Sequence, residues 1–531
     1  MSTDPTTTTS AATPPATGVN GNGRTDPVWY AAADVPKYLP LVGDESADVC
    51  VVGAGIAGLT TAYLLAKAGR SVIVLDQKRV ADGETGRTSA HLASAVDDRF
   101  FEIERLHGVD GSRVQYESHN AAIDLIERIS RDEDIACDFK RLDGFLFLGP
   151  TDKTDVLDKE IEAARRAGFH DVERLSEAPT RGFASGPCLR FPRQARFQPV
   201  QYLAGLARKM AQMGVRFRTG NRVIEMTGGG QTTAKTLEGH TVTAKAAVAA
   251  TNVPSPINNW AGIYTKIAPY RTYMVGLRVP KGLIGDALYW DTLDPYHYVR
   301  LDGSAGDREH DVLIAGGEDH KTGQHTSAIE ERERFERLEA WTRQKFPRAA
   351  ELVFRWTGQV NEPDDYVAYI GRAPTSGMDN VYVITGDSGM GLTHGTLGGM
   401  LVADLIQGKP NPWADLYDPA RKKLKAGTEW LKENANAVAQ YADYVTPGEV
   451  ASADEIRPGT GAVIRKGLRK VAAYKDEHGT VTECSAACTH LKGVVHWNDV
   501  EKSWDCPVHG SRFDCHGKAI HGPAVDDLPK E

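Results

Sequence analysis

The stretch Asp48-Val-Cys-Val-Val-Gly53-Ala-Gly55-Ile-Ala-Gly58-Leu59 lies near the start of the chain and decides how its first large domain folds. The β-branched run 49–52 predicts a buried parallel strand, and residues 60–68 predict an amphipathic helix that ends at Gly69. The three glycines complete the pattern GxGxxG, which permits a tight turn, close approach of a pyrophosphate and close helix–strand packing. The unpaired N–H groups of a helix N-terminus favour the bound anion. The stretch therefore predicts a phosphate-binding turn between strand and helix.

A second predicted strand, Ser71–Leu75, ends in Asp76, whose carboxylate can bind ribose hydroxyls. Strand, glycine turn, helix and acid together predict a dinucleotide site, although a glycine-rich turn in an ordinary α/β core would share part of the pattern. The chain contains no second GxGxxG. If the one predicted dinucleotide site holds a flavin, a separate NAD(P)H site is not expected. The electrons that reduce the flavin should then come from an organic substrate.

Two cysteine–histidine pairs stand near the other end of the chain, in Cys488-Thr-His490 and Cys506-Pro-Val-His509. Two thiolates and two imidazoles can hold a [2Fe–2S] cluster, with the thiolates on one iron and the imidazoles on the other. Tetrahedral zinc is the alternative, but zinc fingers usually group cysteine with cysteine and histidine with histidine. We therefore predict that Cys488, His490, Cys506 and His509 are the cluster ligands.

The phrases CTHL and CPVHGSRF around these ligands resemble the two boxes of Rieske iron–sulfur domains. High-potential members of that family carry a further cysteine in each box, joined in a disulfide, where this chain has Gly493 and Val508. Ser511 is kept, but Phe513 replaces a tyrosine that hydrogen-bonds a cysteine sulfur in those members. Fewer hydrogen bonds to sulfur stabilise the reduced cluster less, so the resemblance implies a lower potential than that of respiratory Rieske centres.

Three stretches resemble the D-amino-acid-oxidase-like (DAO) family of flavoenzymes: the loop 83–91, the strand and turn 246–254, and the strand, glycine loop and helix 382–393. The resemblance covers roughly residues 28–408 and implies that the dinucleotide is FAD. It also implies that the last glycine loop lies against the pyrimidine end of the flavin and favours its anionic reduced form. The expected FAD-binding residues are Gly53, Gly55, Gly58, Asp76, Gln77, Arg87, Thr88, Ser89, Val223, Thr251, Gly386, Gly389, Met390, Gly391, Leu392 and Thr393.

The middle of the chain predicts a substrate domain. Helical periodicity is found over residues 114–130, and Pro199 suits the first turn of a helix. Alternating apolar residues predict strands over 270–279, 287–290, 296–301 and 312–316, which fit a mixed sheet. The predicted fold is therefore α/β, with a Rossmann-like FAD-binding domain, a mixed-sheet substrate domain and a small all-β Rieske domain.

His91 is the candidate catalytic residue because the family resemblance implies that its loop runs along the flavin. Such chemistry mainly requires a substrate that is oriented with its C–H bond over the flavin, so no catalytic triad is expected. Lys266 could provide a cation near the flavin. Five further side chains could line the substrate pocket, although a core or solvated position is the more common one for such residues: Tyr273, Tyr296, Tyr298, Arg300 and His320.

Composition and boundaries complete the prediction. The net charge of −9 gives no indication of nucleic-acid binding. No run of about 18 apolar residues predicts a membrane span, and the Thr/Pro/Ala/Gly-rich start has no apolar core of an export signal. The seven cysteines form no disulfide framework, Cys484 and Cys515 are expected to be structural, and the protein is expected in the cytoplasm. The expected domains are a disordered tail 1–27, the catalytic part 28–410, a helical joint 411–445 and the Rieske domain 446–531.

These expectations favour an enzyme in which FAD takes electrons from an amine or amino acid and a Rieske cluster relays them singly to an external acceptor, a protein or a quinone. A plain oxidase would have no use for a one-electron relay. Two alternatives stay open: an oxidase that uses oxygen and has a structural or sensory cluster, and an electron-transfer or reductase component without its own small substrate.

Overall fold

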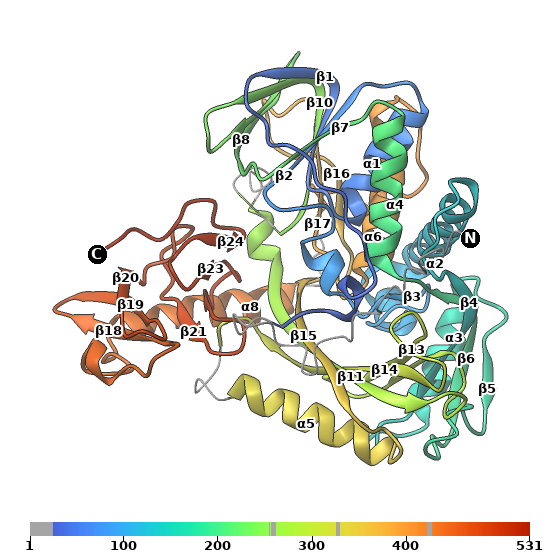
Figure 1. The fold of residues 1–531 in the computed structure, drawn as a ribbon. Coiled ribbons are helices and arrows are strands. Elements are labelled where there is room, and N and C mark those ends of the chain that lie inside the picture. Colours follow the sequence, from blue (N-terminus) through green and yellow to red (C-terminus); the bar gives the residue numbers. More distant parts are fainter. Residues whose placement is uncertain (1–24, 254, 256–261, 325–329, 422–426) are drawn as a thin grey trace, which may run out of the picture.

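The computed structural model describes residues 25–253, 255, 262–324, 330–421 and 427–531 (Figure 1). Within these residues the first sheet follows the order β16-β17-β10-β1-β2-β7, and the hairpin of β8 and β9 pairs with β10. Neighbours from β17 to β7 are parallel, and β16 joins the edge in the antiparallel direction. The strands are β1 (Glu45–Val52), β2 (Val72–Asp76), β7 (Arg216–Thr219), β8 (Val223–Thr227), β9 (Thr232–Thr236), β10 (Thr241–Asn252), β16 (Tyr369–Arg372) and β17 (Val381–Thr385).

The glycine turn connects β1 to α1 (Ile56–Lys67), as predicted. The helix begins four residues earlier than predicted, however, and it is buried on most sides rather than amphipathic. The reason is α6 (Gly391–Ile406), which packs along it. A Cβ atom on Gly395 would lie 2.6 Å from the Ile56 side chain, and one on Gly399 would lie 2.7 Å from Thr60, so the glycines of α6 permit this close helix pair.

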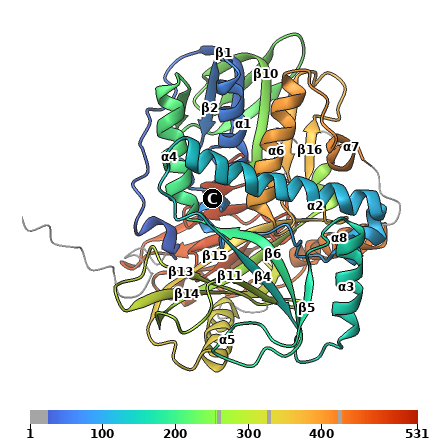
Figure 2. The same cartoon turned by 90° about the vertical axis from the view of Figure 1, so that its right-hand side faces the viewer.

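The second sheet has the order β15-β11-β14-β13-β12-β4-β6-β3, with β5 beside β6. It is mixed, because β4 and β12 are parallel while the other pairs are antiparallel. Helix α5 (Glu330–Lys345) packs on β11 and β14, while α2 (Phe100–Asp132, kinked at Gly108) crosses between the two sheets (Figure 2). The remaining elements are β3 (His91–Leu92), β4 (Lys140–Phe147), α3 (Asp155–Arg166), β5 (Glu173–Leu175), β6 (Cys188–Arg196), α4 (Pro199–Gln212), β11 (Ile267–Pro280), β12 (Leu288–Asp291), β13 (Tyr298–Asp302), β14 (His310–Lys321) and β15 (Leu352–Pro363).

The C-terminal strands, orange and red in Figure 1, form two small antiparallel sheets on one side of the catalytic part. One sheet has the order β18-β19-β20 and the other β21-β22-β23-β24. The predicted fold class, α/β with a mixed second sheet and a small all-β domain, is confirmed. The strands are β18 (Thr460–Lys466), β19 (Arg469–Lys475), β20 (Val481–Ser485), β21 (His496–Asn498), β22 (Ser503–Asp505), β23 (Arg512–Asp514) and β24 (Ala519–His521).

Two segments lie at the ends of the catalytic part. In the joint 411–445, which is predicted to be helical, the described residues include α7 (Ala414–Tyr417), α8 (Gly427–Ala439) and the short 3-10 helix η5 (Gln440–Tyr444). Residues 422–426 of the joint and residues 1–24 of the expected tail lie outside the described residues. The last residues of the expected tail are held in place, because Thr25 is buried and its hydroxyl donates to Glu501 Oε1 at 2.5 Å. In the described part of the chain, no helix combines the length and hydrophobicity that crossing a bilayer requires.

Candidate functional site

A cavity of about 900 Å³ lies between the parallel sheet and the mixed sheet. Its wall contains the glycine turn after β1, the end of β2, the loop 83–91 and the loop before α6. Gly58 and Thr393 are not in the wall; Gly58 packs α1 against the turn and Thr393 is buried in α6. The other sequence-predicted residues that line the cavity are Gly53, Gly55, Asp76, Gln77, Arg87, Thr88, Ser89, His91, Val223, Thr251, Gly386, Gly389, Met390, Gly391 and Leu392.

The cavity wall suits a dinucleotide. The first turns of α1 and α6 both face the cavity, which directs the positive ends of two helices into it. Asp76 accepts hydrogen bonds from the backbone N–H groups of Ala54 and Lys78, each at 2.7 Å, which fixes its carboxylate at the end of β2. Burial raises the pKa of Asp76 to about 6. A cavity of this volume with glycine backbone, helix N-termini and this acid in its wall fits FAD.

The glycine turn allows a test of this site. A Cβ atom at Gly58 would lie 1.8 Å from the carbonyl oxygen of Gly53, so Gly58→Ala must separate α1 from the turn. We expect purified Gly58→Ala protein to contain less than about a tenth of the wild-type FAD, which corresponds to a loss of roughly 1.4 kcal/mol or more of binding free energy. FAD content is measured by absorption after denaturation. Gly43→Ala is the control, because nothing lies within 4 Å of a Cβ there; equal FAD contents of the two variants would contradict the prediction.

The C-terminal domain also forms part of the cavity wall, through Ile520, His521, Gly522, Ala524 and Val525. His521 lies 3.5 Å from the Glu84 carboxylate, and Gln77 donates to the carbonyl of Ile520 at 3.4 Å. Sequence reasoning missed these residues, since nothing in the chain links residues 520–525 to the glycine turn.

Arg87 and Arg222 bind the C-terminal domain to this wall. Arg87 was predicted to bind FAD; it lines the cavity, but its guanidinium group points to the domain interface and pairs with Glu501 at 2.9 Å. Arg222 donates to the carbonyls of Val525 and Ala519, each at 2.7 Å. The two domains therefore share the cavity wall and are held together through these two arginines.

His91, the candidate catalytic residue, lines the cavity beside Tyr298, with ring centroids 5.5 Å apart. Its Nδ1 lies 3.0 Å from Ser89 Oγ, and its Nε2 has no hydrogen-bond partner among the described residues. Burial, reinforced by the Arg300 charge, lowers the pKa of His91 to about 3. The imidazole is therefore neutral, and its Nε2 can form one hydrogen bond with a bound molecule.

The structure separates the remaining candidates. Tyr296 and Tyr298 line the cavity. Tyr273 is buried in a core cluster and stacks on His320. The Arg300 guanidinium donates to the carbonyls of Ala90 and Phe197, and Lys266 Nζ lies 3.4 Å from the carbonyl of Arg421; neither residue lines the cavity. The suggestion that Lys266 provides a cation near the flavin is therefore not supported.

The four predicted cluster ligands come from two loops of the C-terminal domain, one between β20 and β21 and one between β22 and β23. The side chains of Cys488 and Cys506 lie in the same core cluster, and the His490 and His509 ring centroids are 5.1 Å apart. Burial lowers the pKa of His490 to about 4 and of His509 to about 3, so both imidazoles are neutral, as metal ligands must be. One pair of thiols and one pair of imidazoles fit a two-iron cluster.

The surroundings of the thiols agree with the Rieske comparison. A Cβ at Gly493 would lie 2.4 Å from the Val508 side chain, so the two positions that carry the extra cysteines in high-potential members are neighbours here. The Ser511 hydroxyl hydrogen-bonds the Cys488 sulfur, while Phe513 is buried without a donor group. Cys484 is buried behind the cluster loops, where its thiol lies 3.4 Å from the carbonyl of His516.

This arrangement predicts the effect of Ser511→Ala on the cluster. Loss of one hydrogen bond to a ligand sulfur removes about 1 kcal/mol of stabilisation from the reduced, more negative cluster. For a one-electron couple this lowers the potential by roughly 40 mV. A redox titration followed by low-temperature EPR measures the shift. Ser485→Ala, whose hydroxyl accepts from a backbone N–H at 3.3 Å, is the control, and an unchanged potential in Ser511→Ala would refute the assignment.

The large cavity and the cluster loop share lining residues. Ala268 of β11 and Glu433 of α8 line the large cavity, and both also line a small pocket together with Pro269, Tyr264 and His509. The Tyr264 ring lies edge-on to His490 and His509, at 5.2 and 5.0 Å between centroids.

A direct hydrogen bond joins the cavity wall to the cluster loop. Gln359 lines the large cavity, and its amide donates to the carbonyl of Gly510, the residue after His509, at 3.2 Å. The loop also approaches β11 closely, because a Cβ at Gly510 would lie 2.5 Å from Pro269. The cluster loop is therefore docked on the strands that form the cavity wall.

Comparisons with known proteins agree with this architecture. The family model described as "FAD dependent oxidoreductase" (DAO) matches residues 48–405, and the model described as "Rieske [2Fe-2S] domain" matches residues 446–530. A Bacillus subtilis protein, named as the Rieske 2Fe-2S iron-sulfur protein YhfW, is 28% identical over 94% of this chain and 96% of its own length.

Two further proteins resemble the catalytic part. Gamma-glutamylputrescine oxidoreductase of Escherichia coli is 28% identical over 71% of this chain and 88% of its own length. The crystal structure of glycine oxidase from Geobacillus kaustophilus superimposes with a TM-score of 0.58 at 19% identity, over 71% of this chain and 99% of that one. The chain therefore belongs to the DAO family of FAD dependent oxidoreductases and carries, at its C-terminus, a Rieske domain for a [2Fe-2S] cluster.

Proposed function

We propose that the enzyme oxidises an amine or amino acid at a C–N bond and that the electrons leave through the Rieske cluster to an external acceptor. When bound, FAD supplies a two-electron acceptor and the cluster a one-electron carrier. The observation that carries the proposal is the position of Ala268, which lines both the large cavity and the pocket of His509.

The chain's own residues support this relay by docking the cluster loop. The hydrogen bond from Gln359 to Gly510 and the contact of Gly510 with Pro269 hold His509 against β11. Tyr264 packs on both cluster histidines. A cluster with a purely structural role would not require its histidines to lie beside a strand of the cavity wall.

On the substrate side of the cavity, the residues bind and orient the substrate and do not themselves carry electrons. His91 is neutral and offers one hydrogen bond at Nε2, and the aromatic side chains of Tyr296 and Tyr298 exclude water from the same part of the cavity. The name of the E. coli relative, gamma-glutamylputrescine oxidoreductase, is consistent with an amine as substrate.

An anaerobic titration of the iron-replete enzyme tests the proposal. Candidate amines and amino acids are added, while visible absorption reports the flavin and low-temperature EPR reports the cluster. We expect a substrate to bleach the flavin absorption, followed by the signal of a reduced Rieske centre. Flavin bleaching with a cluster that stays oxidised would favour an oxidase that uses oxygen. If no small substrate bleaches the flavin, the electron-transfer component becomes the leading interpretation.

We further propose that the enzyme works in the cytoplasm and that its acceptor is a protein or a quinone. None of the seven cysteines forms a disulfide in the structure, which supports a reducing compartment. Detection of the protein by fractionation of its native cells tests the location.

A further inference from the structure

The half of the cavity that faces the mixed sheet is rich in carboxylates. Asp97 and Asp98 come from the loop before α2, Asp319 from β14 and Glu362 from β15, and all four line the cavity. Among the described residues none of them forms an ion pair with lysine or arginine. The guanidinium group of Arg99 lies nearby but donates to the backbone carbonyls of Asp97 and Asp291.

Asp98 and Glu362 compete for one hydrogen atom. The Ser388 hydroxyl lies 3.1 Å from Asp98 Oδ2 and 2.5 Å from Glu362 Oε1, and it can donate to only one of them at a time. Burial and the neighbouring carboxylates raise the pKa of Asp98 to about 8 and raise the pKa of Glu362 well above its usual range. Ionising both carboxyls in the empty cavity is therefore unfavourable, and a cation bound between them would favour their charged forms.

Asp319 adds an unpartnered acceptor. Its Oδ1 is shielded from solvent and has no hydrogen-bond partner among the described residues, although the side chain lines the cavity. Burial raises the pKa of Asp319 to about 7. A buried carboxylate oxygen without a partner is costly, so a donor is expected from the molecule that fills the cavity.

Aromatic rings complete this part of the wall. Tyr296 and Tyr298 lie with ring centroids 5.4 Å apart, and Tyr270 and Trp290 line the same cavity. Tyr296 also donates to Asp97 Oδ2 at 2.6 Å. Carboxylates with aromatic faces between them form an environment that attracts an organic cation and repels an anion.

We infer that the substrate carries a second, positively charged ammonium group, as a diamine or polyamine does, and that Asp98, Asp319 and Glu362 bind it. The inference rests on the proposed function and narrows its substrate class. The nitrogen at the oxidised C–N bond must be neutral to lose a hydride, and a cluster of carboxylates would keep a nearby amine protonated. The carboxylates therefore suit a cation that stays charged throughout the reaction, and they disfavour an amino acid, whose carboxylate they would repel.

The experiment compares three molecules of similar length: α,ω-diaminobutane, n-butylamine and γ-aminobutyrate. Each is titrated into the FAD-loaded enzyme without oxygen, with calorimetry for binding and visible absorption for flavin reduction. We expect diaminobutane to bind at least about tenfold more tightly than butylamine, a difference of roughly 1.4 kcal/mol, and γ-aminobutyrate to bind most weakly. Equal binding of the three, or preference for γ-aminobutyrate, would overturn the inference.

Variants test whether the carboxylates cause the preference for diaminobutane over n-butylamine. In Asp319→Asn, and separately in Glu362→Gln, the ratio of the two amine dissociation constants should fall toward one, while n-butylamine binds as before. Asp110→Asn is the matched control, since its side chain is 92% exposed on α2, and it should keep the wild-type ratio. An unchanged ratio in both cavity variants would overturn the assignment. Tight diaminobutane binding without flavin bleaching would contradict the proposed amine oxidation and leave this binding site established.

Discussion

The His509→Ala variant is expected to lose about 100-fold or more of its turnover with a one-electron acceptor, while substrate still bleaches its flavin. The reason is spatial separation of the two sites: the cavity residues are intact, but the imidazole that faces β11 and would ligate the cluster is absent. Loss of ligands or their supporting groups commonly costs 10–100-fold or more in metal affinity or activity. Stopped-flow reduction of the flavin and steady-state turnover with a one-electron dye measure the two halves separately.

His478→Ala is the matched control for this variant. His478 is an exposed residue in the turn between β19 and β20, away from the cluster loops, and its replacement should change neither rate. FAD content and the thermal unfolding curve show whether His509→Ala retains its fold. Turnover of His509→Ala at the wild-type rate with the one-electron dye would remove the cluster from the electron path.

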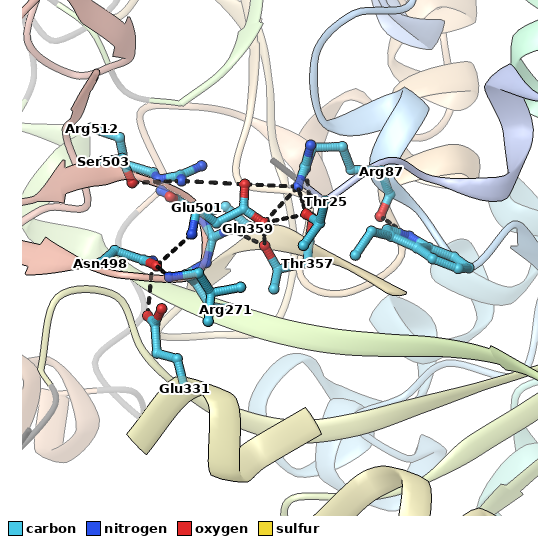
Figure 3. A network of polar contacts seen from close by, with 12 residues as sticks. Thr25, Arg87, Arg271, Glu331, Thr357, Gln359, Asn498, Glu501, Ser503 and Arg512 are labelled. Carbon is cyan, nitrogen blue, oxygen red and sulfur yellow. Dashed lines mark hydrogen bonds and ion pairs between the residues drawn. The ribbon is translucent and has the colours of Figure 1, made fainter. Parts of the chain in front are cut away.

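Replacing Glu501 with glutamine is expected to lower the free energy of unfolding by about 3–5 kcal/mol, the usual effect of removing one partner from a buried ion network. Figure 3 shows Glu501 at the centre of the domain interface, where three arginines surround its carboxylate. The distances are 2.9 Å to Arg87, 3.7 Å to Arg271 and 3.8 Å to Arg512. Arg271 is completely buried. Without the carboxylate, the three guanidinium charges, two of them buried, would repel each other across the interface.

The pH dependence of this effect has a defined sign. The three arginines, led by Arg87, hold the pKa of Glu501 at about 2, despite its burial. A carboxyl whose folded pKa is depressed stabilises the protein above its unfolded pKa and loses this contribution as the pH falls through the folded value. The difference between wild type and Glu501→Gln should therefore be full at neutral pH and shrink between about pH 4.5 and pH 2.

Urea unfolding of both proteins at several pH values measures this difference. Glu483→Gln is the control, because the Glu483 partner Lys466 is a half-exposed surface residue and such pairs contribute about 0–1 kcal/mol. Equal stability losses in the two variants would show that the interface network does not hold the domains together.

Features whose physical requirements are local were predictable from the sequence. The turn after β1 needs glycine at Gly53, where φ is +113°, and at Gly58, where no Cβ fits, so a few adjacent residues specify the dinucleotide-binding turn. The cluster boxes are equally local, since each short loop supplies one thiol and one imidazole. The assignment of the individual ligands and FAD contacts stays a prediction from these patterns.

Contacts between distant segments were decided by the tertiary structure alone. Arg87 lies in a loop predicted to follow the flavin, yet its charge is used at the interface, because Glu501 comes within 2.9 Å only after the C-terminal domain docks. The sequence placed Tyr273 and Tyr296 in one group of candidates, and only the packing of the mixed sheet buried the first in the core and turned the second into the cavity.

The cluster of carboxylates on the substrate side of the cavity could likewise not be predicted from the sequence. Asp98, Asp319 and Glu362 come from three separate segments, and none of them stands in a recognisable motif, whereas Ser388 lies in the glycine loop of the stretch 382–393. Nothing in the local sequence indicates that one hydroxyl will serve two acids or that residues 520–525 will close the other end of the cavity. Local patterns determined the cofactors, because a turn or a ligand pair depends on neighbouring residues. The tertiary structure decided what surrounds them, because charge, burial and distance across a cavity depend on segments that meet only in the folded chain.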